Sequence, residues 1–238
     1  ETNSPDPIPI NDGEAATTMS TLIDLTGPLG PDMWSYAPSI DDIPPFEQKR
    51  WARIEERGWE ADWFAMPTLA GTYLETAKHL IADAPSIDQV PLERLFVDAT
   101  IARIPRGPRE HITAADLDAA ITELLPGDAL LVQTGWEAHR GDSETFVLQS
   151  PHFDMDAMRW IVDRGVSILG GDMPCFDDPV GDEGQGVNMV LFGSDALILA
   201  PLVNLGATEA TRGRLTVLPI PLVDSCGAPC RAIFAPER

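Results

Sequence analysis

The stretch that decides the fold is MPTLAGTYLETAKH, residues 66–79. A Gly71-Thr72 pair lies at its centre, and three side chains able to carry chemistry follow at short intervals: Tyr73, Glu75 and His79. Glu75 and His79 are four residues apart, so they would share one face if this stretch were helical. The spacing alone therefore leaves two interpretations open, a surface pair and an acid–base site.

Further blocks extend outward from this stretch in both directions. IDLTGPLGPDMWSY (23–36) precedes it, and four blocks follow it: SIDQVPLERL (86–95), ITAADLDAAITELLPGDALLVQTGWEAH (112–139), MRWIVDRGVSILGGD (158–172) and GAPCRAIFAPE (227–237). In this order the six blocks resemble the metal-dependent cyclase and kynurenine formamidase family. The central stretch is similar in spacing to the family signature H-x-G-T-H-x-D-x-P-x-H, and the resemblance covers roughly residues 20–236.

The resemblance implies a single α/β domain over residues 20–238, with a mixed β-sheet core flanked by helices. It also implies assembly as a homodimer or homotetramer, because members of the family commonly assemble in this way. Residues 1–19 are polar and rich in proline, so we expect them to form a flexible N-terminal arm.

In the family, the signature supplies histidine and aspartate ligands for a divalent zinc or manganese ion that hydrolyses formamides, lactams or related carbonyl compounds. Carried over position by position, the metal ligands are replaced here. The family's two signature histidines and its aspartate correspond to Leu69, Tyr73 and Glu75, and a later histidine and glutamate correspond to Asn188 and Ala200. Only the last histidine of the signature is kept, as His79, a residue usually assigned to proton transfer in the family.

This replacement predicts an enzyme that uses no metal cofactor. Leu69 and Ala200 have no donor atoms, and a tyrosine with a pKa of about 10 pays a deprotonation cost before it binds a metal. A carboxyl group in a pocket made more apolar should have a raised pKa, so Glu75 is the expected acid. His79 is the expected base or proton shuttle, and Tyr73 the hydrogen-bond donor to a substrate carbonyl.

Three functions remain open for such a site. The first is metal-independent acid–base catalysis on a small carbonyl-containing metabolite, such as cyclisation, dehydration or related lyase chemistry. The second is an amidohydrolase like arylformamidase, with an altered site that binds one zinc or manganese ion through Glu75, His79 and other groups. The third is a ligand-binding protein without catalysis, since folds outlive their functions.

The expected substrate-binding residues surround this site. They are Leu69, Thr72, Trp63, Phe64, Trp136 and Asn188. Outside the signature, His111, His139 and His152 are expected in loops or on the surface, with His139 nearest the pocket. Asp172, Asp177 and Asp178 resemble the acids of a family block, and Asp172 is expected to be structural.

Periodicity predicts several elements around these blocks. Strands are expected in residues 21–26, 97–104, 129–136, 166–172, 196–205 and 214–222. Helices are expected in residues 45–58, which have Pro at the start and Gly at the end, and in residues 112–125 and 155–166. Thr113 is the expected N-cap of the second of these helices.

The composition limits the partners. The formal net charge is -22, which disfavours binding to nucleic acid or anionic membranes. No apolar run approaches the roughly 20 residues of a membrane span. The three cysteines, Cys175, Cys226 and Cys230, are too few for a disulfide framework and are expected to be buried and reduced. We therefore expect a soluble, cytoplasmic protein whose partner is a small-molecule substrate.

Overall fold

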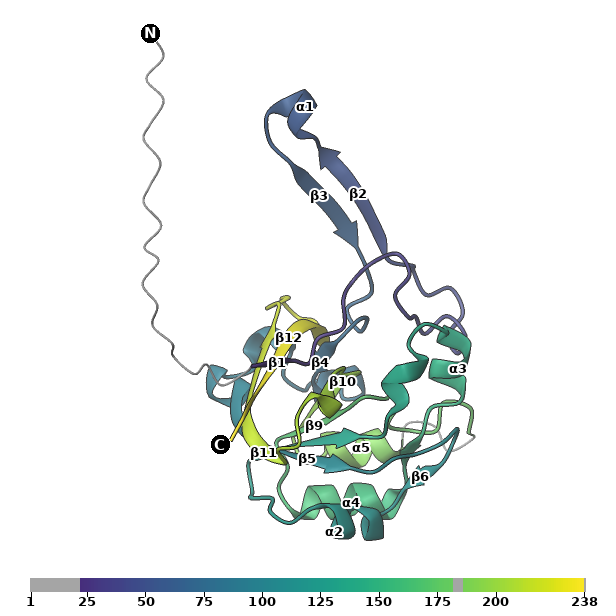
Figure 1. The fold of residues 1–238 in the computed structure, drawn as a ribbon, viewed down its shortest axis with the longest axis vertical. Helices are drawn as coiled ribbons and strands as arrows, with labels where there is room; N and C mark the ends of the chain where they lie inside the picture. Colours follow the sequence, from purple (N-terminus) through teal and green to yellow (C-terminus); the bar gives the residue numbers. More distant parts are fainter. Residues whose placement is uncertain (1–21, 182–185, 238) are drawn as a thin grey trace.

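The structure of this chain is a computed structural model that describes residues 22–181 and 186–237. The arm expected at residues 1–19 lies outside the described residues. Within them the chain forms the mixed α/β fold that the sequence predicts, built on one large sheet (Figure 1). The strands of this sheet are, in spatial order, β1 (Ile23–Asp24), β12 (Gly227–Pro236), β11 (Arg212–Pro219), β5 (Phe96–Arg103), β7 (Ala129–Gln133), β9 (Ile168–Gly171), β10 (Leu197–Ala200) and β4 (Tyr73–Glu75).

The sheet closes on itself at β4. This strand pairs antiparallel with β10 on one side and antiparallel with β12 on the other, so seven strands form a ring and β1 is added beside β12. Neighbouring strands from β5 to β10 are parallel, whereas β11, β12 and β4 join the ring in antiparallel pairs. The decisive stretch of the sequence therefore forms the strand at which the ring closes.

Two apolar cores pack against opposite faces of the sheet. In β7, Ala129 and Leu131 belong to one core, and Leu130 and Val132 belong to the other. A strand buried on both faces is expected to be a continuous apolar run, which explains the ALLV sequence of β7. The same alternation in β4 places Leu74 in the first core and Tyr73 in the second.

Helices cover the second core. They are α2 (Ala114–Ala120), α3 (Ser143–Leu148), α4 (Met155–Asp163) and α5 (Gly186–Phe192), and a short parallel pair, β6 (His111–Ile112) and β8 (His152–Phe153), lies beside them. The helix expected at 155–166 is confirmed as α4. The helix expected at 112–125 is confirmed only in its first part, where Thr113 and Asp116 form a capping box at the start of α2. It ends at Ala120 because Ile121 is already extended.

The helix predicted at residues 45–58 is wrong. The region forms a two-stranded hairpin, β2 (Glu47–Ala52) and β3 (Ala61–Ala65), with the four-residue helix α1 (Ile54–Arg57) at its tip. Figure 1 shows the hairpin projecting away from the rest of the domain. Its cross-strand contacts are largely aromatic and ionic, such as Lys49 over the Trp63 ring and Arg50 paired with Asp62. Gly58 does end a helix, because its backbone is left-handed (φ 76°), but that helix is only the single turn α1.

Among the described residues, no helix is both long enough and apolar enough to cross a membrane.

Candidate active site

Strand β4 places Tyr73 and Glu75 on the same side of the sheet, because side chains two residues apart in a strand point the same way. Backbone pairing on both edges fixes this strand, with Glu75 opposite Ile198 in β10 and opposite Gly227 in β12. Thr72, just before the strand, is buried, and its hydroxyl donates to the Pro201 carbonyl (2.7 Å) while accepting from the Gly27 N–H (3.0 Å). The predicted catalytic side chains therefore lie on a rigid support.

These two side chains line a cavity of about 310 Å³. We call it the Glu75 cavity. Its wall combines polar groups with apolar side chains, a mixture typical of small-molecule sites. The lining residues that carry the chemistry discussed below are Tyr36, Tyr73, Glu75, Cys175, Asp177 and Asn188.

Two tyrosines form one hydrogen-bonded pair in this cavity. The Tyr36 hydroxyl donates to the Pro174 carbonyl (2.6 Å), and the two hydroxyl oxygens of Tyr36 and Tyr73 are 2.9 Å apart. A phenol has one proton, so Tyr73 must be the donor to Tyr36. Burial raises the pKa of both phenols well above 10, so both are neutral donors at physiological pH.

Glu75 is a buried carboxyl group whose environment favours its neutral form. Burial raises its pKa to about 8, and the negative charge of Asp177 adds to the rise. The described residues supply no hydrogen-bond donor to its oxygens within bonding distance, so nothing offsets the loss of water. Glu75 therefore carries its proton at neutral pH, in the direction that the sequence predicted.

Asp177 is the second carboxyl group of the cavity, and the predicted site residues did not include it. One of its oxygens accepts from the backbone N–H groups of Val187 (2.9 Å) and Asn188 (3.2 Å) at the start of α5. Burial raises the pKa of Asp177 to about 6, and these two hydrogen bonds limit the rise. The only sequence signal was its resemblance to the acids of a family block.

His79 contacts Glu75 from outside the cavity lining. A 3₁₀ turn, Ala77–His79, follows β4 and places Nδ1 of His79 at 3.6 Å from Oε1 of Glu75. Burial lowers the pKa of His79, so at neutral pH the imidazole and the Glu75 carboxyl are both neutral and the contact is not a salt bridge. The side chain of His79 is 32% exposed, so it joins Glu75 to solvent.

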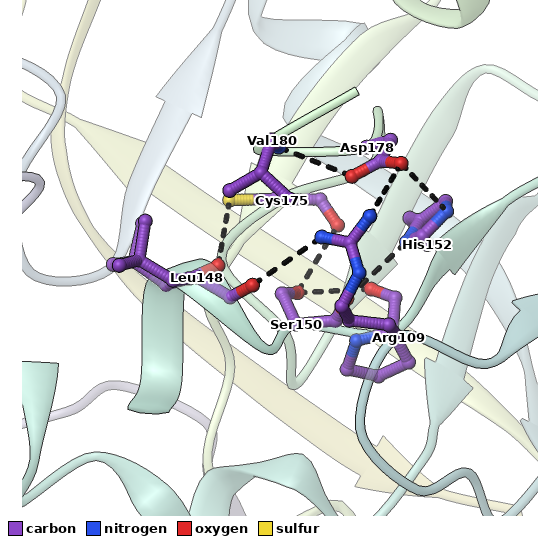
Figure 2. A network of polar contacts seen from close by, with 9 residues as sticks. Arg109, Leu148, Ser150, His152, Cys175, Asp178 and Val180 are labelled. Atoms are coloured by element: carbon purple, nitrogen blue, oxygen red, sulfur yellow. Dashed lines mark hydrogen bonds and ion pairs between the residues drawn. The ribbon is translucent and has the colours of Figure 1, made fainter. Parts of the chain in front are cut away.

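A polar network holds the segment that carries Asp177 (Figure 2). Asp178 accepts from Arg109 (2.8 Å) and from the Val180 N–H (3.1 Å), and His152 lies 3.9 Å from the same carboxylate. Arg109 adopts a left-handed backbone conformation (φ 59°), which is uncommon for a residue other than glycine. Arg109 and Asp178 thus connect the loop before β6 to the loop after β9, next to the cavity.

The donor atoms around Glu75 do not fit a divalent metal centre. Burial raises the pKa of Tyr73 well above 10, so its phenol would have to give up a tightly held proton before binding a metal. Leu69 and Ala200, at two other ligand positions of the resemblance, have no donor atoms. Throughout the described ranges, no group of three or more His, Cys, Asp or Glu residues is placed to hold a metal ion. The absence of a metal cofactor remains a prediction.

The structure does not bring all the predicted substrate-binding residues to this cavity. Asn188 lines it, whereas Thr72 is buried at the residue before β4. Trp63 and Phe64 are about half exposed on β3, because that strand pairs only with β2 and faces no core. Trp136 is buried, and its indole donates to the Phe146 carbonyl (2.9 Å). These three aromatic residues do not line the cavity that holds Tyr73 and Glu75, and their role in substrate binding stays a prediction.

Leu69 lines a second, neighbouring cavity, and Ala200 is buried at the end of β10, opposite Tyr73. Asp172 is structural in its contacts, as predicted: its carboxylate accepts from Thr134 N–H and hydroxyl and from the Gly135 N–H. His152, expected in a loop or at the surface, is instead buried in β8.

Known proteins resemble this chain over most of its length. The family model described as "Putative cyclase" matches residues 23–178. The kynurenine formamidase of Bacillus cereus (strain ATCC 14579) is 24% identical over 217 residues, which cover 91% of this chain and 98% of that protein. Isatin hydrolase A from Ralstonia solanacearum superimposes with a TM-score of 0.81 at 20% identity, covering 91% of this chain and 92% of its own.

A further solved structure, described as a "predicted metal-dependent hydrolase from Bacillus stearothermophilus", superimposes with a TM-score of 0.73 at 19% identity, covering 90% of this chain and 97% of its own. At these identities the two solved structures establish the fold, and the functions in their descriptions belong to those proteins.

Proposed function

This chain belongs to the cyclase family, and on that premise we propose that it is a hydrolase-type enzyme that acts on a small carbonyl compound by acid–base catalysis from its own side chains. One observation carries the proposal: Glu75 and Asp177 line one cavity with pKa values raised to about 8 and about 6. Between these values, one carboxyl group is protonated while the other is ionised. Environments that separate the pKa values of two acids in this way assign them the roles of acid and base.

The proposed substrate carries an amide or related carbonyl bond. The relatives are described as a formamidase and an isatin hydrolase, and both descriptions imply cleavage of a carbon–nitrogen bond at a carbonyl. A cavity of about 310 Å³ suits a molecule of one or two rings. The apolar wall, which includes Ile40, Phe176 and Ile198, would contact such rings.

In the proposed mechanism, Asp177 takes a proton from water as the water oxygen bonds to the carbonyl carbon. The neutral Tyr73 hydroxyl donates to the carbonyl oxygen, once that oxygen replaces Tyr36 as its acceptor. Glu75 then gives its proton to the departing nitrogen as the carbon–nitrogen bond breaks. The products are a carboxylic acid and an amine, and the enzyme is left with Asp177 protonated and Glu75 ionised.

The pKa order supports the return to the starting state. Because the pKa of Glu75 lies above that of Asp177, the proton moves back from Asp177 to Glu75 in the favourable direction. His79, half-buried beside Glu75, offers a route for that proton through solvent. This assigns His79 the role of shuttle and leaves the base role to Asp177.

The test combines metal content with activity on a panel of N-formyl anilines, lactams and isatin. Protein purified without chelator or affinity metal is assayed by elemental mass spectrometry and then with and without EDTA. We expect less than about 0.1 equivalent of transition metal per chain and turnover of at least one panel member that EDTA leaves unchanged.

Close to one tightly held zinc or manganese per chain, together with loss of turnover in EDTA, would overturn the metal-free mechanism and favour the amidohydrolase alternative. Binding of panel members without turnover would favour the ligand-binding alternative.

A further inference from the structure

The wall of the Glu75 cavity carries acidic side chains and no basic ones. Three carboxyl groups line it, those of Glu75, Asp177 and Asp178, and none of the described lining residues is Lys, Arg or His. Burial acts to raise the pKa of Asp178, but hydrogen bonds from the Val180 N–H and from Arg109 outweigh it, and the pKa is lowered. Because the pKa of Asp177 is about 6, both aspartates are ionised at neutral pH.

One cation contacts this wall from outside the lining. The Arg109 guanidinium donates to Asp178 (2.8 Å) and to the Leu148 carbonyl (3.4 Å), as Figure 2 shows. A single guanidinium balances at most one of the two ionised aspartates, so about one negative charge is left at the cavity. The formal net charge of -22 on the whole chain adds to the negative potential there.

The hydroxyl donors of the cavity are already engaged. Tyr36 donates to the Pro174 carbonyl (2.6 Å), Tyr73 donates to Tyr36 (2.9 Å), and the Ser39 hydroxyl donates to the Tyr36 carbonyl (3.2 Å). A bound anion would need several donors or a cation to replace its water. The described wall therefore offers an anion little compensation.

The acceptors of the cavity, in contrast, have unused capacity. Asp178 accepts one hydrogen bond on each oxygen, from Arg109 and from the Val180 N–H, whereas a carboxylate has about four lone-pair sites. Glu75 is 5% exposed and lines the cavity, and its oxygens receive no hydrogen bond from the described residues. This buried carboxyl group without a donor is a second sign, independent of the aspartates, that the cavity is built for a molecule that brings donors.

We infer that the substrate of this cavity carries a basic nitrogen whose ammonium group binds Asp178, and that the cavity excludes anionic substrates. An ammonium group supplies three donors and one positive charge, which are what the wall lacks. Binding at Asp178 leaves the neighbouring Asp177 free to act on water. The inference rests on the proposed function in taking this cavity as the substrate site, but not in the chemistry assigned to it.

Three probes of matched shape test the inference: 3-acetylbenzylamine, 3-acetylbenzyl alcohol and 3-acetylbenzoate. At neutral pH the first is a cation, the second is neutral and the third is an anion. Each is a ketone without a carbon–nitrogen bond at its carbonyl, so binding is measured whether or not the chain cleaves amides. The probes are titrated into ¹⁵N-labelled protein, and the backbone N–H signals of residues 175–178 report the affinity by NMR.

The amine is expected to bind about 10-fold more tightly than the alcohol, the low end for a hydrogen bond to a charged group, because Asp178 is partly exposed and paired with Arg109. The benzoate should bind at least about 10-fold more weakly than the alcohol. In Asp178→Asn the amine should lose its advantage and the benzoate should gain affinity, because Arg109 is left without its counter-charge. The exposed Glu93→Gln, which removes the same charge elsewhere, should keep the natural order.

Equal affinity for the amine and the alcohol, or tightest binding of the benzoate, would overturn the inference. An undiminished preference for the amine in Asp178→Asn would overturn it as well, and so would the absence of saturable binding by all three probes. If Asp178→Asn does not fold, the order of the three probes on the natural chain still decides the question. Failure of the amide panel to turn over would count against the proposed catalysis and leave this order unaffected.

Discussion

Glu75 and Asp177 line the same cavity, but the chain supports their carboxyl groups in different ways. Glu75 extends from a strand whose backbone groups are engaged in pairing on both edges, so the N–H groups of this strand are not available to its oxygens. Asp177 lies in a loop that meets the first residues of α5, where free N–H groups point at its carboxylate. Secondary structure thus determines which carboxyl group keeps its proton, because paired strands engage the N–H donors that the start of a helix leaves free.

The largest expected effect comes from removing either carboxyl group. Glu75→Gln and Asp177→Asn should each lower kcat by about 10²–10⁴, the usual contribution of a general acid or base. Steady-state kinetics on the best panel substrate measures this, with the exposed Glu93→Gln as the matched control. Normal turnover by either variant would remove that residue from the mechanism.

His79→Ala should reduce kcat by about 10² if the imidazole carries protons between Glu75 and solvent. Added imidazole should restore part of the rate, because a free base can take the place of the missing side chain. A rise in KM with kcat unchanged, and no recovery with added imidazole, would mean that His79 only packs against Glu75.

The pH dependence tests the comparison directly. The active form has Asp177 ionised and Glu75 protonated, so kcat/KM should rise with pH through about 6 and fall through about 8. Each limb should change the rate up to about tenfold per pH unit. Residual activity of Asp177→Asn should lack the acid limb, and that of Glu75→Gln should lack the alkaline limb. The same limb missing from both variants would show that the two assignments are wrong.

Arg109→Ala acts on one carboxyl group only. Loss of its hydrogen bond to Asp178 should loosen the segment that carries Asp177, so we expect kcat to fall about 3–10-fold, with the acid limb shifted and the alkaline limb in place. Arg109→Lys, which keeps the charge, should recover part of the rate. An equal shift of both limbs would contradict a role confined to Asp177.

The smallest effect concerns stability. The pKa of Glu75 is higher in the folded chain than in the unfolded chain, so the folded state binds more protons between pH 4.5 and 8. The free energy of unfolding must therefore fall as pH rises through that window. Glu75→Gln should be more stable than the natural chain by about 1 kcal/mol or more at pH 9, and nearly equal at pH 5. Urea unfolding at pH 5 and pH 9 measures the free energy of unfolding of each chain. The control variant Glu93→Gln should match the natural chain at both pH values.

Much of the fold was predictable because it depends on patterns that survive in this sequence. The apolar run of β7 and the capping box at Thr113 indicate their elements directly. The hairpin was missed because β2 is exposed on both faces until Ala52 and so has no period-two pattern. Its flanking proline and glycine also match the signals of a helix.

The candidate site was predictable only in part. Burial is the main cause of the raised pKa of Glu75, and that direction was predictable from the apolar residues expected around it. The support of Asp177 depends on N–H groups from residues 187 and 188, whose approach only the folded chain brings about.

The closure of the ring at β4 has a consequence for how such a site can evolve. This strand is held by main-chain pairing with β10 and β12, which does not depend on which side chains it carries. Substitutions at positions 73 and 75 can therefore accumulate without opening the ring. The backbone atoms of β4 determine the shape of the ring, whereas the side chains of the same three residues determine the reactivity of the site. A scaffold of this kind can therefore exchange one chemistry for another through folded intermediates.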